Sequence, residues 1–522
     1  MDSRGGFAGK EYSYEKSNEY RGVANTKEYS AERNAEYNGI EKIAQFEMKV
    51  KLKMKEFVVT QFREHYIIIL IIVVFIVIFL MLFHIGTLNN KNYLADNLPK
   101  FPEAIFNKQD RILIIAPHPD DEALATSSVI IKGKEAGATV KVVFVTFGEH
   151  NTSTLTKFLL FPSSVTADLL AKRRYREAIS AAKLLGLSEN DLIFLGFPDF
   201  GTLKIWDDHF SNKPYMSGMN LRNKVFYSGV YKEGVPFTAP EELKLFEEAI
   251  SSYHPTKLFY PSTLDLNSDH RASGLFTEAA LFDLKEDVHP DLYTYFVHSE
   301  DWPEPVGYYP DDYLNPPSYF TNLTGNWFIN LLSKSEEILK LKAVKAYFSQ
   351  YWTKPKFMAS FIRKNELFLT DYQYKLNSNL PMWTREEMQR LKVTPYVEEM
   401  SVSDTGDSYE FSVALYKGVP AFSKIILFVY PEIEGKLFVD SPKYKVIIKR
   451  GVRKNIELTL FDRGKEIESK KDSISGRVNE ITFKIDMNKS YFIDCEGFFC
   501  SAYIEEVEHR VSETPWWLIS VK

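Results

Sequence analysis

The sequence predicts an α/β protein with a mostly parallel sheet and flanking helices. One transmembrane helix precedes this part of the chain, and a β-sandwich-like domain follows it. Three observations support the prediction. Two apolar runs, within residues 111–131 and 259–281, end in a polar turn and continue into a helical pattern. An uncharged apolar run fills residues 67–83. After about residue 395, short strand-like runs alternate with Gly, Asn, Asp and Ser, as is typical of a β-sandwich.

Residues 1–65 form a polar, Tyr-rich tail that we expect in the cytoplasm. Their low aliphatic content favours disorder. Residues 10–22 and 27–39 are two copies of one repeat, which is too few for a solenoid. The tail is either a docking or phosphorylation segment or a duplicated spacer.

Residues 66–86 are long enough to span a bilayer, which takes about 20 apolar residues. The run begins far from residue 1 and no small-residue cleavage motif follows it, so it resembles an anchor more than a signal peptide. More basic residues precede it than follow it over a similar length: Lys49, Lys51, Lys53, Lys55 and Arg63 before, against Lys91 and Lys100 after. The positive-inside rule therefore predicts a single-pass cell-membrane protein, with its N-terminus in the cytoplasm and its catalytic domain outside. An inverted anchor would instead place that domain in the cytosol.

After a linker over residues 87–108, the run Ile112 to Ile115 has the length and branching of a buried strand. It ends in a turn that holds His118 and the carboxylates of Asp120, Asp121 and Glu122. Open α/β sheets place ligands at the carboxyl ends of their strands, and zinc accepts nitrogen and oxygen ligands. Acidic residues are equally common at a helix start. The turn is therefore either half of a metal site or a helix N-terminus.

A second polar turn supports the metal interpretation. The short apolar run 258–260 leads into Asp265, Asn267, Asp269 and His270, followed by a helical pattern. His270 would be the third ligand, from a neighbouring strand end. Two histidines and one carboxylate, with one position left for water, are typical of catalytic zinc. The chain has only two cysteines, which disfavours a thiolate-rich structural zinc site.

Together these motifs resemble the LmbE/PIG-L family of zinc-dependent N-acetylglucosaminyl deacetylases. Further motifs fit the family in order, at residues 145–149, 174–177, 185–186, 194–199, 295–298, 302–303 and 342–350. The resemblance covers roughly residues 109 to 370 and implies a Rossmann-like deacetylase domain over residues 109–390.

The resemblance also implies roles for individual residues. His118, Asp121 and His270 would hold Zn²⁺, Asp120 would be the general base, Arg174 and Asp199 would bind substrate, and Glu122 and Asp269 would support these groups through hydrogen bonds. A carboxylate bound to zinc is a poor base, whereas its unbound neighbour can take a proton from water at the metal, whose pKa zinc lowers to about 7. Asp269 is expected to orient His270 or Asp120.

The sequence departs from the family at one position. Members often carry a histidine three residues before the zinc histidine, which is thought to steady the oxyanion, and here that position is Asn267. An amide can donate a hydrogen bond but cannot be a cation or an acid. His298 is the alternative donor, or else a structural histidine beside Trp302.

Residues 396–522 form the predicted β-rich domain. Such a module could bind carbohydrate or cap the catalytic domain structurally. Cys495 and Cys500 are compatible with a hairpin disulfide in an oxidising compartment or with two buried thiols.

The function predicted from these features is that of a membrane-anchored hydrolase. It would remove the N-acetyl group from N-acetylglucosamine-type sugars of a glycan or glycolipid. The alternative is a catalytically idle relative that binds glycan or scaffolds a surface assembly; the intact ligand set and Asp120 favour the enzyme, and Asn267 favours the alternative. A net charge of -6 and a pI near 6 give no support for nucleic-acid binding. The sequence leaves the oligomeric state undetermined.

Overall fold

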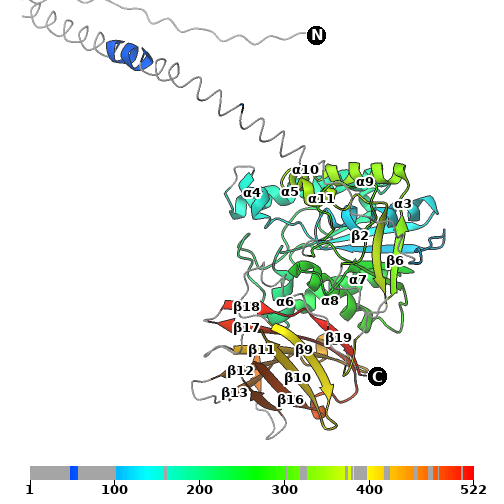
Figure 1. The fold of residues 1–522 in the computed structure, drawn as a ribbon, viewed down its shortest axis with the longest axis vertical. Coiled ribbons are helices and arrows are strands. Elements are labelled where there is room, and N and C mark those ends of the chain that lie inside the picture. Colours follow the sequence, from blue (N-terminus) through cyan, green and yellow to red (C-terminus); the bar gives the residue numbers. More distant parts are fainter. Residues whose placement is uncertain are drawn as a thin grey trace, which may run out of the picture. The chain divides into compact units, whose positions relative to one another are not determined.

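The computed structural model describes residues 48–56, 74, 101–157, 161–299, 302–317, 326–370, 374–377, 380, 397–416, 424–450, 456–467, 474–479, 481–506 and 509–521. The chain divides into two compact units, Met1–Lys91 and Asn92–Lys522 (Figure 1). In the first unit residues 48–56 are helical. The rest of the predicted tail, the predicted span 66–86 apart from Val74, and linker residues 87–100 lie outside the described residues. No helix in the described ranges combines the length and the apolar character that crossing a membrane requires.

The second unit begins with an α/β part. Its strands are β1 (Arg111–Ala116), β2 (Thr139–Thr146), β3 (Leu192–Phe197), β4 (Lys257–Pro261), β5 (Asp291–Tyr295), β6 (Asn326–Leu331) and β7 (Asn365–Thr370). Its helices are α2 (Asp121–Ala125), α3 (Ser127–Glu135), α4 (Thr152–Lys157), α5 (Ser164–Leu184), α6 (Thr202–Asp208), α7 (Ala239–Tyr253), α8 (Ser268–Asp283), α9 (Lys334–Ala346), α10 (Phe348–Tyr351) and α11 (Pro355–Ala359), with a short 3-10 turn at Glu189–Asp191.

These seven strands form one sheet in the order β3-β2-β1-β4-β5-β7-β6. The first five are parallel, while β7 runs antiparallel to both β5 and β6. The predicted α/β class with a parallel-rich sheet is confirmed. Chain order reverses between β1 and β4, and open α/β sheets bind their ligands at such a switch point.

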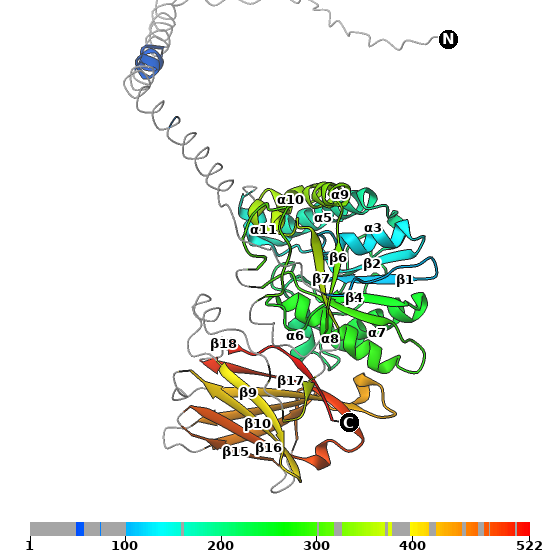
Figure 2. The same ribbon diagram turned by 45° about the vertical axis from the view of Figure 1, so that its right-hand side comes forward.

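Both faces of this sheet are buried, as the alternation along β1 shows. Ile112 and Ile114 belong to the core beneath α3, α5 and α9, whereas Leu113 and Ile115 belong to the core beneath α6, α7 and α8. A strand that is buried on both faces reads as a continuous apolar run, which is why β1 was recognisable in the sequence. Figure 2 shows helices on both sides of the sheet.

The remaining strands form the β-rich part. They are β8 (Tyr374–Lys375), β9 (Val397–Asp404), β10 (Ser408–Leu415), β11 (Lys424–Ile433), β12 (Tyr444–Arg450), β13 (Ile456–Asp462), β14 (Lys465–Ile467), β15 (Ile474–Val478), β16 (Thr482–Asn488), β17 (Cys495–Glu506), β18 (His509–Glu513) and β19 (Trp517–Ser520), with 3-10 turns at Phe438–Asp440 and Lys489–Tyr491. One sheet has four strands, in the order β15-β16-β10-β9. The other has eight, in the order β14-β13-β12-β11-β17-β19-β8, with β18 paired to β17.

The larger of these two sheets is also buried on both faces, at least along β11. Ile425 and Leu427 join the core that includes the smaller sheet, whereas Ile426 and Phe428 join the core that contains α6, α7 and α8. The β-rich part therefore shares a hydrophobic core with the α/β part.

Trp206 on α6 is the centre of that shared core and is fully buried. Six aromatic rings lie with their centroids 5.0 to 5.9 Å from its ring: Phe210 and Phe276 from the α/β part, and Tyr430, Phe438, Phe499 and Trp516 from the β-rich part. Such rings supply large buried areas together with favourable edge-to-face geometry.

The two cysteines do not form the hairpin disulfide that the sequence allowed. Cys495 and Cys500 are free, buried thiols on the same strand, β17. Cys495 pairs with Ile433 and Cys500 with Val429. Five residues of extended chain separate their Cα atoms by roughly 16 Å, far more than a disulfide can bridge.

We predict that Trp206→Ala destabilises the whole unit rather than one half of it. Removing a fully buried tryptophan costs about 3–5 kcal/mol of unfolding free energy. Chemical denaturation should show one transition, shifted to lower denaturant, whether α/β or β-rich probes are followed. Trp352→Ala is the matched control, because Trp352 is 61% exposed and its loss should change stability little. Two separate transitions would contradict the shared core.

Candidate metal centre

The candidate site lies where the parallel strands end. His118 and Asp120 are in the turn between β1 and α2, His270 is in the first turn of α8 after β4, and His298 follows β5. Asp199 lies in the loop that joins β3 to α6. Because the carboxyl ends of parallel strands meet at one edge of the sheet, residues far apart in the sequence converge there.

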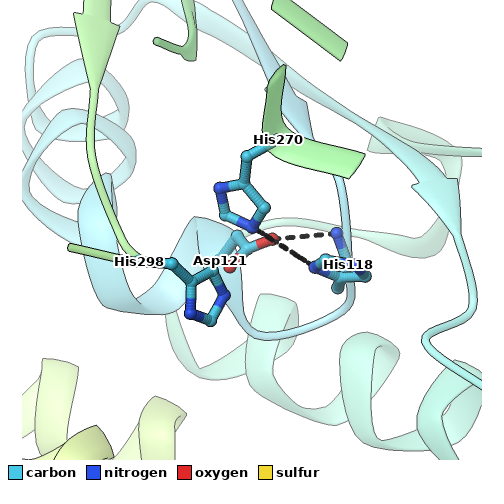
Figure 3. Close-up of side chains that lie close together, drawn as sticks. All are labelled: His118, Asp121, His270 and His298. Carbon is cyan, nitrogen blue, oxygen red and sulfur yellow. Dashed lines mark hydrogen bonds and ion pairs between the residues drawn. The ribbon is translucent and has the colours of Figure 1, made fainter. Parts of the chain in front are cut away.

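Three atoms that can bind a metal meet at this edge. Asp121 Oδ2 lies 3.2 Å from His118 Nδ1 and 3.0 Å from His270 Nε2, and the two nitrogens are 3.3 Å apart. Tetrahedral zinc with bonds of about 2.0–2.1 Å holds its ligand atoms about 3.3 Å from one another. The triangle therefore matches one face of such a tetrahedron. In Figure 3 these three side chains point toward one another, with His298 beside them.

The neighbours of the two imidazoles favour free lone pairs at this triangle. His118 Nε2 contacts Asp269 Oδ2 at 3.2 Å and Asp199 Oδ1 at 3.3 Å, while His270 Nδ1 lies 3.3 Å from Asp265 Oδ2. A carboxylate beside one ring nitrogen favours the proton there and leaves the other nitrogen unprotonated. A bound metal would meet three lone pairs here. Without one, the carboxylates favour protonated imidazoles, because they raise the pKa of both His118 and His270 although burial opposes this.

Asp121 is the anion of this triangle. Burial alone would raise the pKa of its carboxyl, but the imidazoles of His270 and His118 hold that pKa well below its usual value. Its side chain also accepts a hydrogen bond from the His118 backbone N–H at 2.9 Å. The residues present therefore fit a divalent cation such as Zn²⁺, with His118, Asp121 and His270 as the ligands.

Asp120 is placed for a different task. It precedes α2 with φ 133° and makes no cap hydrogen bond with its side chain, so its carboxylate remains available to the site. A non-glycine residue in such a conformation costs about 1–3 kcal/mol and is concentrated at functional sites. Arg174 Nη2 lies 3.2 Å from Asp120 Oδ2. Burial raises the pKa of Asp120 to about 6, although Arg174 opposes the rise.

Glu122 supports this turn from beneath. It is fully buried, accepts a hydrogen bond from the Tyr347 hydroxyl at 2.5 Å and accepts another from the Asp120 backbone N–H at 3.2 Å. Burial raises the pKa of Glu122 to about 8. Its contacts hold the turn between β1 and α2 against α9 and α10.

The two candidate oxyanion donors lie at the same pocket. Asn267 is the N-cap of α8: its Oδ1 accepts from the Asp269 N–H at 2.8 Å, which leaves its amide nitrogen as a donor. The His298 ring lies 4.7 Å from the His270 ring and stacks on Phe357 at 5.6 Å. Burial and His270 lower the pKa of His298 to about 3, so its imidazole is neutral. One of its ring nitrogens lies within 4.8 Å of the three ligand atoms.

The substrate-binding candidates have other contacts as well. Arg174 donates to the backbone oxygens of Gly148 at 2.9 Å and Pro119 at 2.5 Å, so it fixes the turn as well as Asp120. Asp199 accepts from the His150 N–H at 2.7 Å and touches His118. Both residues line the pocket, and substrate contact stays a prediction for them.

The prediction that Asp269 orients His270 or Asp120 was wrong. Asp269 contacts His118 instead of His270 or Asp120, and it also accepts from Phe200 N at 2.7 Å and Thr202 Oγ1 at 2.6 Å. Asp265 takes the place beside His270. Asp265 stands five residues before His270, and nothing in this spacing distinguished it from Asp269 as the partner of that histidine.

Sequence reasoning also missed much of the pocket wall. The cavity above the ligand triangle has a volume of about 170 Å³. Beyond the predicted residues, its lining includes His150, Asn151, Phe200, Gln350, Lys354 and Phe357. These residues come from loops and short helices with no strand or helix period, so nothing in their spacing pointed to a site.

The parallel-rich α/β sheet thus places a His/Asp triangle that could hold a metal at its switch point. Residues 113–281 match the family model described as PIG-L: GlcNAc-PI de-N-acetylase. This region is therefore a PIG-L domain, as the motifs predicted. No curated protein matches the chain.

Several solved structures are similar to this chain. They include N,N'-diacetylchitobiose deacetylase from Pyrococcus horikoshii, with 18% identity over 50% of this chain and 82% of that one and a TM-score of 0.31. GalB, the 4-carboxy-2-hydroxymuconate hydratase from Pseudomonas putida KT2440, has 17% identity over 48% and 82% and a TM-score of 0.32. The zinc-inhibited form of teicoplanin deacetylase Orf2 has 16% identity over 46% and 84% and a TM-score of 0.29.

We predict that Zn²⁺ binds to chelator-treated protein and raises its thermal unfolding midpoint. Binding to the folded state alone stabilises it by about 2.7 kcal/mol when free metal is 100 times Kd. Asp121→Asn and His270→Ala should abolish both the bound metal, measured by elemental analysis, and the shift. His289→Ala, at an exposed histidine beyond α8, should keep both. A metal-dependent shift that survives both ligand substitutions would place the metal elsewhere.

Proposed function

We propose that this chain is a zinc-dependent de-N-acetylase that acts on N-acetylglucosamine-type sugars of a glycan or glycolipid. One observation carries the proposal: three atoms that can bind a metal converge at 3.0–3.3 Å while a separate, partly buried carboxylate, Asp120, lines the same pocket. A module that only binds glycan has no need of an unbound carboxylate beside a metal site. The PIG-L domain supports the same reaction class.

In the proposed mechanism His118, Asp121 and His270 hold the metal. When bound, Zn²⁺ lowers the pKa of a water molecule and polarises the acetamide carbonyl. Asp120 takes the proton of the attacking water and later passes it to the departing amine. Arg174 keeps the Asp120 carboxylate oriented through its 3.2 Å contact. The products are acetate and a free amine on the sugar.

The oxyanion of the tetrahedral intermediate needs a donor from the chain. The neutral His298 imidazole and the Asn267 amide are both at the pocket, and neither carries a charge. We assign the main role to His298, because its ring lies against the ligand His270, whereas the Asn267 side chain is also used to cap α8.

We also propose that residues 66–86 anchor the chain in a cell membrane, with the N-terminus cytoplasmic and the PIG-L domain outside. The uncharged run 67–83 and the excess of basic residues before it support this topology. Protease digestion of intact cells that removes the tail at residues 1–65 but spares the PIG-L domain would overturn the orientation.

Asp120→Asn should abolish acetate release while the metal stays bound. Losing a positioned general base typically costs about 10²–10⁴-fold in rate. The measurement is acetate release by the full chain from N-acetylglucosamine oligomers and glycolipids, with zinc and with chelator. His289→Ala, prepared in the same way, is the control variant and should keep the activity. An Asp120→Asn protein with unchanged rate would contradict the assigned base.

The same assay separates the two oxyanion donors. Removing one such donor lowers kcat by about 10²–10³-fold. We expect that loss for His298→Ala and a smaller one for Asn267→Ala, with unchanged metal content in both. If His298→Ala loses the metal instead, His298 is a ligand and the assignment is wrong.

A further inference from the structure

Exposed apolar side chains gather on helices next to the pocket. Phe161, Val165 and Leu169 are 86%, 68% and 54% exposed, and Phe348 and Trp352 are 48% and 61% exposed. We call these five residues the rim patch. Val165 and Leu169, four residues apart at the start of α5, lie on one side of that helix, and Phe161 lies in the segment just before it.

Contacts join the two halves of the rim patch. Arg173, one further step of four residues along α5, lies with its guanidinium 5.4 Å from the centre of the Phe348 ring. The Phe348 and Trp352 rings are stacked at 5.9 Å. Figures 1 and 2 show α5, α10 and α11 at the same end of the α/β part. The patch is therefore one surface that crosses from α5 to α10.

This surface borders the pocket. Gln350 and Lys354, on either side of Trp352 in the chain, line the pocket, as does Arg174 next to Arg173. Asn151 Nδ2 donates to Gln350 Oε1 at 2.6 Å and ties α4 to the same wall. A ligand leaving the pocket on this side meets the rim patch.

The charges around the patch have one sign. Within residues 161–177 and 348–357, every exposed charged side chain is basic: Lys172, Arg173, Arg176, Lys354 and Lys356. Asp168 is only partly exposed and pairs with Arg222, and the buried Glu177 pairs with Arg173 at 2.9 Å, which leaves Lys172, Arg176, Lys354 and Lys356 as the other basic groups. Aromatic and aliphatic side chains with Lys and Arg beside them are the composition of surfaces that lie on anionic bilayers.

The rest of the chain favours the same partner. Residues 84–100 separate the uncharged run 67–83 from Phe101, where the described fold begins. Even fully extended, a segment of that length spans only about 60 Å. A domain tethered so closely needs only a weak surface to dock, because the tether supplies a high effective concentration.

We propose that the rim patch docks on an anionic bilayer surface, so that the pocket opens toward the headgroup of an N-acetylated glycolipid. The docking rests on the proposed anchor, and the choice of a glycolipid rests on the proposed reaction. Docking in this position would favour a membrane-embedded substrate over a soluble oligosaccharide.

The test uses the full chain reconstituted in vesicles that contain phosphatidylglycerol. A nitrobenzoxadiazole label on Val165→Cys should shift its emission to the blue and be quenched by doxyl lipids. The same label on Ile493→Cys, at a 65% exposed residue of the β-rich part, should do neither. Cys495 and Cys500 are buried, and the unsubstituted chain gives their background labelling.

A label at residue 165 that remains as exposed to water as the label at residue 493 would overturn the docking. A blue shift without lipid quenching, which grows with protein density, would also overturn it, because a second copy of the chain would then cover the patch. Neither result depends on activity, so this arm is independent of the proposed reaction.

A second arm tests the substrate class. Leu169→Glu with Trp352→Glu should lower acetate release from a vesicle-embedded N-acetylglucosaminyl lipid by at least about tenfold, because apolar contact and charge attraction are both lost. Release from soluble N-acetylglucosamine oligomers should not change, since neither residue lines the pocket. Equal loss on both substrates, or on neither, would overturn the interfacial role. If the parent chain releases acetate from neither substrate, the proposed reaction fails while the labelling result stands.

Discussion

The structure depends on the close approach of three atoms that can each bind a metal. Asp121 Oδ2, His118 Nδ1 and His270 Nε2 lie 3.0–3.3 Å apart in a buried place. Without a metal the imidazoles supply the positive charge themselves: burial opposes it, but the carboxylates around them raise the pKa of both His118 and His270. The chain holds them together from three sides: the parallel strand ends bring the turns together, and Asp269 and Asp265 fix the two imidazoles. Asp120, at φ 133°, stands in the turn that directs its own carboxylate to the pocket and that of Asp121 to the triangle.

The β-rich part contributes to the same arrangement through α6. The beginning of α6 holds Asp269, which receives hydrogen bonds from Phe200 N and Thr202 Oγ1. One turn later Trp206 is enclosed by aromatic rings of both parts. On α8, Arg271 follows the ligand His270 and donates to Glu513 of β18 at 2.6 Å. The C-terminal strands thus support the surroundings of both His118 and His270, while carbohydrate binding by this part stays a prediction.

The fold could be predicted from the sequence wherever burial imposes a regular spacing of apolar residues. The turns after β1 and β4 were recognisable because apolar runs end abruptly in clustered polar residues. The antiparallel pair β6 and β7 was not predicted, because strand direction depends on partners distant in the sequence. Residues 424–430 form one of the strand-like runs after residue 395, and their lack of alternation indicates burial on both faces, and hence contact with a second layer. For the site, the three residues expected to hold a metal do lie together. The choice between Asp265 and Asp269 as the partner of each histidine depends on how the loop turns.

The size of the pocket limits what it can recognise. At about 170 Å³ it is smaller than the roughly 300–1,000 Å³ of pockets that enclose a whole ligand. In the proposed reaction it would enclose the acetamido group and part of one sugar, and the rest of the substrate would lie outside. Phe200 lines the pocket, is 47% exposed and is held at φ 58°, a conformation that aromatic residues rarely adopt. An exposed aromatic ring at this place would be a suitable platform for the apolar face of a sugar. Selection among acetylated sugars would therefore depend more on these outer surfaces than on the metal site. The metal site would contact only the acetamide, which all of these sugars share.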